Sequence, residues 1–325
     1  MNIDGIILVQ KPQGVGPFDC TNKVKEAFDM TQVSHIESLE PRVEGVLPIF
    51  TGKATKLLRL FKGGIREYSC EITLGYSTTT EDITGEIIDQ AEIKRKPSAK
   101  RVEKILASML GEHSQISPMY SASMYKGKKL HKYLEEGVTI PEKERPVRHV
   151  EILDIALETE IVRTEADLVK FSCYIKCTDG TFIRSLAVAI GKELGHPAHM
   201  SRLKRLAVGP FKLAEAADYE TFVMRLSILS SDGKGSISFS NKKKQTWFIP
   251  YEEILKSYPR IPLSNDEEAQ EIERKIRKGK KIPYESLKTN TQPDEPFILT
   301  TLSNEPIAIY ALAKDSQQYY SFAVL

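Results

Sequence analysis

A loop that carries a histidine and several carboxylates is the stretch of this sequence best suited to chemistry. It runs from Ser34 to Pro48 and holds His35 and Glu40, with Pro41 immediately after the glutamate. The proline ring disfavours a helical conformation at Glu40, and Gly45 permits a turn that other residues resist. We therefore expect a rigid scaffold to present Glu40 on a loop, as catalytic acids often are. The alternative is a plain surface loop, because most loop carboxylates are only solvated.

Basic and aromatic side chains gather in a second stretch, residues 115–137. A nucleic-acid surface needs positive charge for phosphates and flat rings for bases, so this stretch is a candidate RNA surface. The alternative is a solvated helix face with half-buried tyrosines. The residues concerned are Lys126, Lys128, Lys129 and Lys132, which lie beside Tyr120, Tyr125 and Tyr133.

An arginine near a predicted helix start is the third candidate. A helix with one apolar face is predicted from Ile183 to Leu194, after the turn at residues 178–180. Arg184 lies near its N-terminus, where a cation is electrostatically misplaced, which hints at a purpose, although a surface arginine is the commoner explanation. A second basic group follows and consists of His199, Arg202, Lys204 and Arg205.

Length and composition set the frame for these candidates. A chain of 325 residues suits two domains, and 41% hydrophobic with 28% charged residues is typical of a soluble globular protein. A net charge of +2 means that any polyanion site must come from local clustering. No apolar run approaches the ~18 residues of a membrane span, and the start lacks a signal peptide, so we expect a cytoplasmic protein. The four cysteines fit no zinc pattern and are expected as free thiols.

Periodicity predicts the elements that position the candidates. Helices are expected at about 19–30 with Asp19 as N-cap, at 98–109 with Ser98 as N-cap, and at about 266–278. Residues 51–60 are interpreted as a turn that enters a helix, with only a superficial likeness to a phosphate-binding loop. Strands are predicted at 5–9, 46–50, 68–74, 86–88, 169–177, 297–299, 307–310 and 320–324, and residues 150–152 and 155–157 together suggest one more.

A change of composition divides the chain. Residues 229–245 are rich in serine, glycine and lysine and lack periodicity, which predicts an exposed loop or linker. We therefore predict a large domain at residues 1–228 and a small β-rich module at residues 246–325.

Taken together, these stretches resemble the TruB family, the bacterial tRNA pseudouridine-55 synthases. Residues 34–48 resemble the family's catalytic loop, in which Gly-His-Thr-Gly-Thr-Leu-Asp-Pro precedes a Gly-Val-Leu-Pro run. Other matching blocks follow in order along nearly the whole chain. They are residues 5–14, Gly52 to Lys56, Tyr68, the hydroxyl-rich loop 74–85, residues 118–130, Gly180 to Leu186 and Val208 to Phe211.

The resemblance implies an α+β pseudouridine synthase fold, with a mostly antiparallel central sheet flanked by helices and a PUA-like C-terminal module. It also implies a monomer that acts without metal or cofactor. The implied reaction breaks the glycosidic bond of a uridine in the tRNA T-arm and rejoins C1′ to C5 of the same base. The family's aspartate, the nucleophile or base, corresponds to Glu40.

Further roles come from the same resemblance. Tyr68 would pack against the flipped base, and Arg184 would hold the catalytic carboxylate by a charge-assisted pair. His35 would fill the space that the base vacates, and Lys11 would support the loop from behind. The expected tRNA contacts are Lys126, Lys128, Lys129, Lys132, Arg202 and Arg205.

Several polar positions depart from the family pattern. Glutamate replaces the aspartate at position 40, and an extra methylene moves a carboxylate by roughly 1 Å. The other departures are Gln10, Gly16-Pro17, Glu37-Ser38, Arg42-Val43-Glu44, Met124, His131, Phe182 and Ala189. Two hypotheses follow. One is an active tRNA pseudouridine synthase with a shifted carboxylate, and the other is a non-catalytic paralogue that binds the T-arm as an RNA-binding or folding factor.

Overall fold

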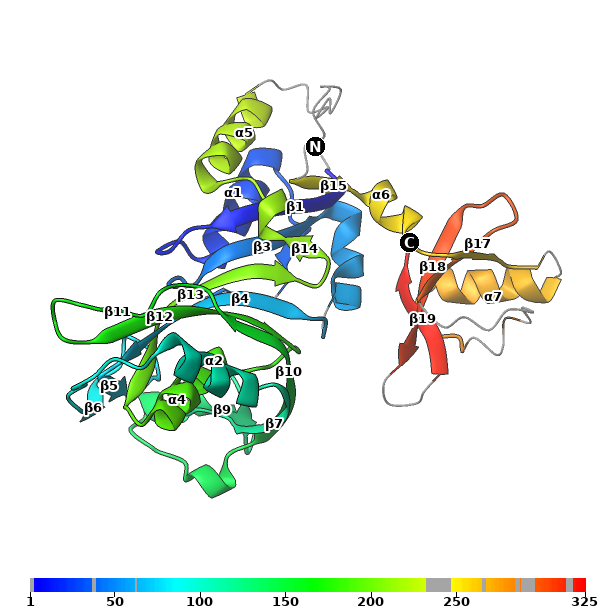
Figure 1. Cartoon of the computed structure of the whole chain (residues 1–325). Coiled ribbons are helices and arrows are strands. Elements are labelled where there is room, and N and C mark those ends of the chain that lie inside the picture. The colour runs from blue at the N-terminus through cyan, green and yellow to red at the C-terminus, as the bar shows by residue number, and fades with distance from the viewer. Residues whose placement is uncertain are drawn as a thin grey trace.

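The computed structural model describes residues 3–36, 39–61, 63–231, 247–264, 267–283, 287, 296–313 and 318–325. Within these residues, two sheets of unequal size carry the fold (Figure 1). The large sheet has the order β15-β1-β3-β13-β4-β12-β10-β7, and every pairing along it is antiparallel except that of β13 with β3. A mostly antiparallel central sheet was predicted, and the structure confirms it.

The strands of the large sheet are β1 (Gly5–Lys11), β2 (Val33–His35), β3 (Glu44–Thr51), β4 (Arg66–Leu74), β7 (Gly111–Ile116), β10 (Val147–Leu157), β11 (Val162–Arg163), β12 (Val169–Cys177), β13 (Ala198–Val208), β14 (Phe211–Lys212) and β15 (Phe248–Pro250). Two small hairpins stand apart from it, β5–β6 (Tyr76–Thr78 and Ile87–Gln90) and β8–β9 (Met124–Tyr125 and Lys128–Lys129).

The helices of this part are α1 (Pro17–Phe28), α2 (Ala99–Ser108), α3 (Leu130–Glu135), α4 (Ile183–Leu194) and α5 (Tyr219–Ser231). 3₁₀ helices lie at Gly52–Phe61, Glu142–Glu144 and Leu213–Glu215. The first of these replaces the α-helix expected after residue 51. Four helices, α1, α2, α4 and α5, bury their apolar stripes in one core cluster against the sheet.

Helix α1 begins two residues earlier than predicted. Pro17 occupies its first turn, where the missing amide costs nothing. Gly16 is the N-cap, and Asp19 lies in the first turn, where its Oδ2 accepts a hydrogen bond from the Gly16 amide at 2.8 Å. The prediction of Asp19 as N-cap is therefore wrong. By contrast, Ser98 caps α2 as predicted, because its Oγ accepts from the Arg101 amide.

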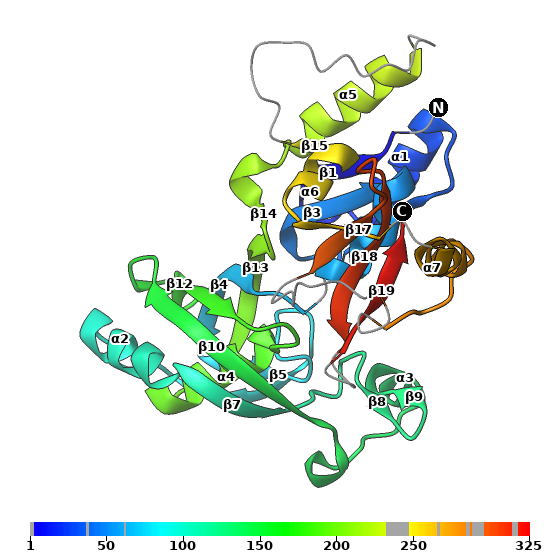
Figure 2. The same cartoon turned by 90° about the vertical axis from the view of Figure 1, so that its right-hand side faces the viewer.

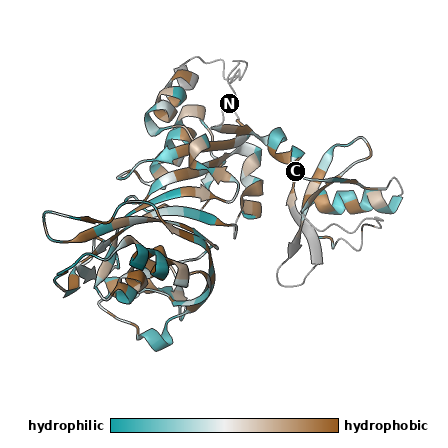
Figure 3. Cartoon of the chain, in the orientation of Figure 1, coloured by the Kyte–Doolittle hydropathy of each residue, from teal (hydrophilic) through white to brown (hydrophobic). Residues whose placement is uncertain are grey.

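Both faces of β1 are buried, which explains its unbroken apolar sequence. Ile7 and Val9 belong to the core that the four helices cover. Ile6 and Leu8 point to a second core, which Ile298 from the small sheet also enters. Figure 3 shows the result as a band of hydrophobic residues along the central strands. The small sheet is therefore packed onto the large one through apolar side chains.

The small sheet is built from β16 (Arg260–Pro262), β17 (Phe297–Thr300), β18 (Pro306–Ala313) and β19 (Gln318–Val324), with α7 (Glu267–Arg277) against it. Figure 2 shows this sheet and α7 together, turned toward the viewer. The predicted strands and short helix of a small β-rich region are confirmed here.

The boundary between the two predicted domains remains a prediction. Residues 229–231 continue α5, and residues 232–245 of the expected linker lie outside the described residues. Beyond them, β15 pairs with β1 of the large sheet, and α6 (Tyr251–Lys256) packs in the second core. The small sheet therefore begins only after α6. None of the helices in the described part of the chain is long and apolar enough to cross a membrane.

Candidate active site

A four-residue turn presents Glu40. The Val43 amide donates to the Glu40 carbonyl at 2.9 Å, which closes the turn around Pro41. Leu39 and Val43 are buried and anchor both ends of the turn, while the Glu40 side chain is exposed. Glu37 and Ser38, just before this turn, lie outside the described residues. The turn therefore holds Glu40 on a fixed backbone and directs its carboxylate away from the core.

The buried side chain of Lys11 binds the backbone of this turn. It is 0% exposed, and its Nζ donates to the carbonyls of Pro12 at 2.9 Å, Val15 at 2.8 Å and Pro41 at 3.3 Å. The Gly14 amide donates to the same Pro41 carbonyl at 2.7 Å. Burial lowers the pKa of Lys11. The residue thus ties the loop after β1 to the turn of Glu40.

Strand register brings the turn next to Tyr68. Gly45 of β3 lies opposite Arg205 of β13, and Arg205 lies opposite Tyr68 of β4. Gly45 has a φ of +129°, and a Cβ on it would lie 2.2 Å from the Arg205 carbonyl oxygen. Only glycine lets the strands approach so closely. This row across three central strands places the turn of Glu40 beside the ring of Tyr68.

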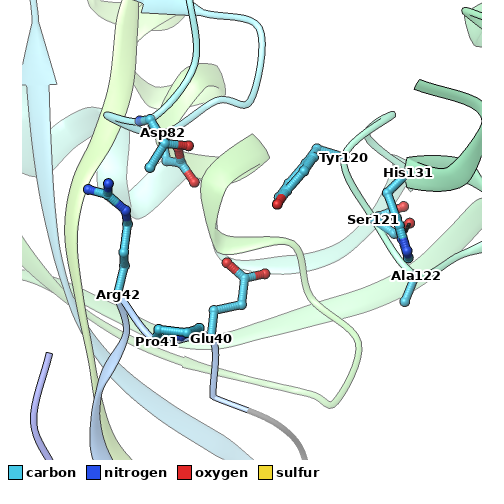
Figure 4. Close-up of a pocket in the computed structure, with 9 residues that line it drawn as sticks. Glu40, Pro41, Arg42, Asp82, Tyr120, Ser121, Ala122 and His131 are labelled. Atoms are coloured by element: carbon cyan, nitrogen blue, oxygen red, sulfur yellow. Dashed lines mark hydrogen bonds between the residues drawn. The ribbon is translucent and has the colours of Figure 1, made fainter. Parts of the chain in front are cut away.

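Two neighbouring cavities meet at Glu40. One, of about 260 Å³, is lined by Glu40, Tyr68 and Arg184 among others. The other, of about 470 Å³, has Glu40, Arg42, Asp82 and Tyr120 in its wall, with Ser121 and His131 at one end (Figure 4). The Glu40 carboxylate points into this space and makes no hydrogen bond or ion pair to any described residue.

Arg184 does not hold Glu40 as expected. Its Nη1 lies 3.7 Å from Asp82 Oδ2, and its guanidinium donates to the carbonyls of Thr80 at 3.0 Å and Tyr120 at 2.8 Å. The guanidinium also lies over the Tyr120 ring at 5.4 Å. No Glu40–Arg184 pair occurs among the described residues, so that prediction is wrong for this structure. Arg184 instead connects the hydroxyl-rich loop (residues 74–85) to Tyr120 in the wall of the larger cavity.

Asp82 is a site residue that sequence reasoning matched to a family block but did not select. Its Oδ1 accepts from the Thr80 hydroxyl at 2.7 Å, the Thr84 hydroxyl at 2.6 Å and the Thr84 amide at 2.8 Å. It is 8% exposed, and yet it lines the larger cavity. The signal was present in the sequence, because threonines two residues on either side of an aspartate are suited to orient its carboxylate.

The same loop contains a half-buried glutamate, Glu81. Glu81 has a φ of 64°, and its Oε2 accepts from the Ser185 hydroxyl at 2.6 Å, near the start of α4. Burial raises the pKa of Glu81, although the Ser185 hydrogen bond and the charge of Arg184 oppose the shift. The loop is also joined to β13, since the Met200 amide donates to the Glu81 carbonyl at 3.0 Å.

His35 lies on β2, on the other side of the turn. Burial and then the charge of Arg205 lower its pKa. Its ring meets the exposed ring of Phe18 edge-on, with 5.1 Å between the centroids. His35 therefore sits in an aromatic setting beside the turn, outside the two cavities.

The four predicted RNA-binding lysines lie in the β8–β9 hairpin and in α3, and their contacts differ. Lys128 pairs with Glu136, and Lys132 pairs with Glu135 at 2.7 Å. Lys126 stacks over the Tyr125 ring at 5.0 Å, and Lys129 is exposed. The interleaving of lysine and tyrosine is thus real, but two of the four charges are already partly neutralised.

The two predicted RNA-binding arginines of β13 also differ. Arg202 is exposed and pairs with Glu44 at 2.9 Å. Arg205 is 1% exposed and donates twice to the Val46 carbonyl, at 3.1 and 2.9 Å. The prediction of a surface contact to tRNA is wrong for Arg205, because its guanidinium is buried and binds the backbone of β3.

The chain has relatives among known proteins. Residues 25–183 match the model of the TruB family pseudouridylate synthase N-terminal domain. The chain is 35% identical over 308 residues to tRNA pseudouridine synthase B of Geobacillus thermodenitrificans, covering 95% of this chain and 94% of that protein. It is 43% identical over 218 residues to tRNA pseudouridine synthase B of Bacillus subtilis, covering 67% and 69%.

A solved structure shares the fold at lower identity. The crystal structure of a Cbf5-Nop10-Gar1 complex contains a chain that matches with a TM-score of 0.64 and 20% identity. The match covers 94% of this chain and 78% of the other. With relatives more than 30% identical along most of its length, the chain belongs to the TruB family of pseudouridylate synthases.

Proposed function

We propose that the chain isomerises a uridine in the T-loop of tRNA to pseudouridine, with Glu40 as the catalytic nucleophile or base. One observation carries the assignment of Glu40: its carboxylate enters a cavity of about 470 Å³ and has no partner among the described residues. Ligand sites of roughly 300–1,000 Å³ hold small molecules and nucleotides, so the space suits a uridine turned out of the RNA strand.

The walls of the cavities supply the remaining contacts. Tyr68 and Tyr120 offer aromatic faces against which a flipped base can stack. Arg184, held by Asp82 and by two carbonyls, fixes the wall between them before any substrate arrives. The chain's own part in the reaction is therefore to extract the nucleotide, orient it and place one carboxylate beside its sugar.

The T-arm as the recognised part of tRNA, and a monomer as the active form, belong to the same proposal. Exposed Lys129 and Lys126 at the β8–β9 hairpin provide phosphate contacts near the cavity wall of Ser121 and His131. The four cysteines are free and buried, and tRNA is the substrate, so we place the activity in the cytoplasm.

Tritium release from tRNA labelled at C5 of uridine tests the proposal. The native protein is expected to release tritium, because C5 loses its hydrogen when the new C–C bond forms. Glu40→Gln is expected to abolish release while tRNA binding survives. Glu40→Asp keeps the functional group but moves it by about 1 Å, and such displacements can change rates by about 100-fold. Salt-sensitive tRNA binding without any release by the native protein would leave only an RNA-binding function.

A further inference from the structure

We propose that Arg42 binds a phosphate of the RNA strand beside the reacting nucleotide. This inference rests on the proposed function, because it assumes that the cavity of Glu40 receives RNA. It goes further by assigning the strand's backbone to one wall of that cavity and by giving a role to a side chain that the resemblance leaves unexplained.

The turn that presents Glu40 also presents Arg42. The two residues are separated only by Pro41, whose ring restricts the backbone, and the hydrogen bond from Val43 closes the turn. Arg42 is exposed and lines the cavity of about 470 Å³. In Figure 4 its side chain rises along one side of the cavity toward Asp82, while Tyr120 stands on the opposite side. A nucleotide between them would have its base toward Tyr120 and its backbone toward Arg42.

Among the described residues around this cavity, Arg42 is a cation without a protein partner. Arg184 is occupied by Asp82 and two carbonyls. Lys11 donates to three carbonyls, and Arg205 donates to Val46. The Arg42 guanidinium makes no hydrogen bond or ion pair with any residue of the described chain. Its donors are therefore available to a ligand.

A carboxylate in the cavity makes a cationic contact to the RNA backbone necessary. Glu40 lines it without an ion pair in the described structure, whereas Asp82, also in the wall, is paired with Arg184. A phosphate that enters meets the Glu40 carboxylate, and like charges in a partly buried site repel strongly. A guanidinium matches a phosphate with two parallel hydrogen bonds. Arg42 thus offsets the repulsion at the place where the backbone must pass.

Salt-dependent binding of full-length tRNA tests the inference. Each phosphate contact contributes about 0.9 to the slope of log Kd against log salt concentration. Arg42→Ala is therefore expected to weaken binding about 10-fold near physiological salt and to reduce the slope by about 1. Arg42→Lys should keep the slope and lose part of the affinity. Arg225→Ala, on α5, is the control, because Arg225 is also exposed but lies outside both cavities. An unchanged slope in Arg42→Ala would overturn the inference.

A second measurement identifies the phosphate. In a T-arm hairpin RNA, methylphosphonates replace the phosphates around the target uridine one at a time. One replacement is expected to weaken binding by the native protein and to leave Arg42→Ala unaffected. Equal losses for both proteins at every position would contradict the contact. If the native protein releases tritium but Arg42→Ala has the same salt slope of tRNA binding as the native protein, only this inference is overturned. If Arg42→Ala reduces the salt slope but the native protein releases no tritium, only the proposed catalysis is overturned.

Discussion

The guanidinium of Arg184 lies 3.7 Å from the carboxylate of Asp82, and this ion pair joins the start of α4 to the hydroxyl-rich loop. Both groups are nearly buried, at 13% and 11% exposure of their side chains. The pair is therefore screened little by solvent. Since Arg184 also donates to the Tyr120 carbonyl, Asp82 determines indirectly where one wall of the cavity stands.

Asp82→Asn should slow catalysis with little effect on folding. The neutral amide keeps some hydrogen bonds with Thr80 and Thr84 but loses the ion pair, so Arg184 is free to move. A displacement of about 1 Å in such a wall corresponds to a loss of about 100-fold in rate. Single-turnover tritium release measures it, with the exposed Asp89→Asn as the control. Equal rates for the two variants would show that Asp82 does not position the wall.

Lys11→Met should destabilise the fold itself. The variant keeps the apolar stem but removes the donor that the part-buried carbonyls of Pro12, Val15 and Pro41 share, and only Pro41 retains a second donor, the Gly14 amide. Unsatisfied buried groups cost about 1–3 kcal/mol each, and we expect a loss of about 3 kcal/mol in the free energy of unfolding. Urea denaturation measures it, and the exposed Lys56→Met should change stability by less than about 0.5 kcal/mol. Similar values for both variants would contradict the supporting role.

Two glycines separate backbone strain from steric clash. Gly14→Ala changes a residue with φ +89° and open space around it, so only the conformational penalty of about 1–2 kcal/mol applies. Gly45→Ala adds a Cβ 2.2 Å from the Arg205 carbonyl oxygen. We expect a loss of more than about 4 kcal/mol or no soluble protein. Equal urea midpoints for the two variants would mean that β3 and β13 are less tightly paired than the structure has them.

Glu81→Gln should stabilise the protein at neutral pH. Because burial raises the pKa of Glu81 in the folded state, the stability that its protonated form provides is present below the unfolded pKa. This stability is lost as the pH rises through the raised folded pKa. Glutamine stays neutral and can still accept from Ser185. The thermal midpoint of the variant should therefore exceed that of the native protein at pH 8 and converge with it toward pH 4. A pH-independent difference would contradict this assignment.

Local patterns predicted the elements whose periodicity is unbroken. Strand β12 alternates strictly over Val169–Cys177 and was predicted at its bounds. The apolar stripe of α4 and the cap of α2 were equally readable. The central strand β13 was missed, because bulges after Met200 and Arg205 shift its alternation twice. In β10, residues 150–152 and 155–157 predicted one strand, and the structure has one strand across the bulge after Ile152.

The candidate site was predicted only in part, because some of its features depend on contacts between residues far apart in the sequence. The sequence predicted Glu40 on a loop between Pro41 and a turn at Gly45, because this conformation depends on neighbours in the chain. The partner of Arg184 depends on a loop 102 positions away in the numbering, at Asp82, and on which rotamer its long side chain adopts. Likewise, Arg205 looked like a surface cation beside Arg202, because a bulged strand hides which residues face inward.

The pairing of β15 with β1 has a consequence for how this chain can be divided. Phe248–Pro250 covers the outer edge of β1 with only three residues, and Pro250 is a residue that ends strand pairing. A protein cut at residue 231 would leave this edge of β1 open at Gly5–Ile7, where the strand is highly apolar, while the Leu8 carbonyl and the Gln10 amide would keep their bonds to Ala217. Such edges recruit strands from other molecules. We expect that shortened protein to aggregate, and one that ends after Lys256 to remain dispersed in light scattering.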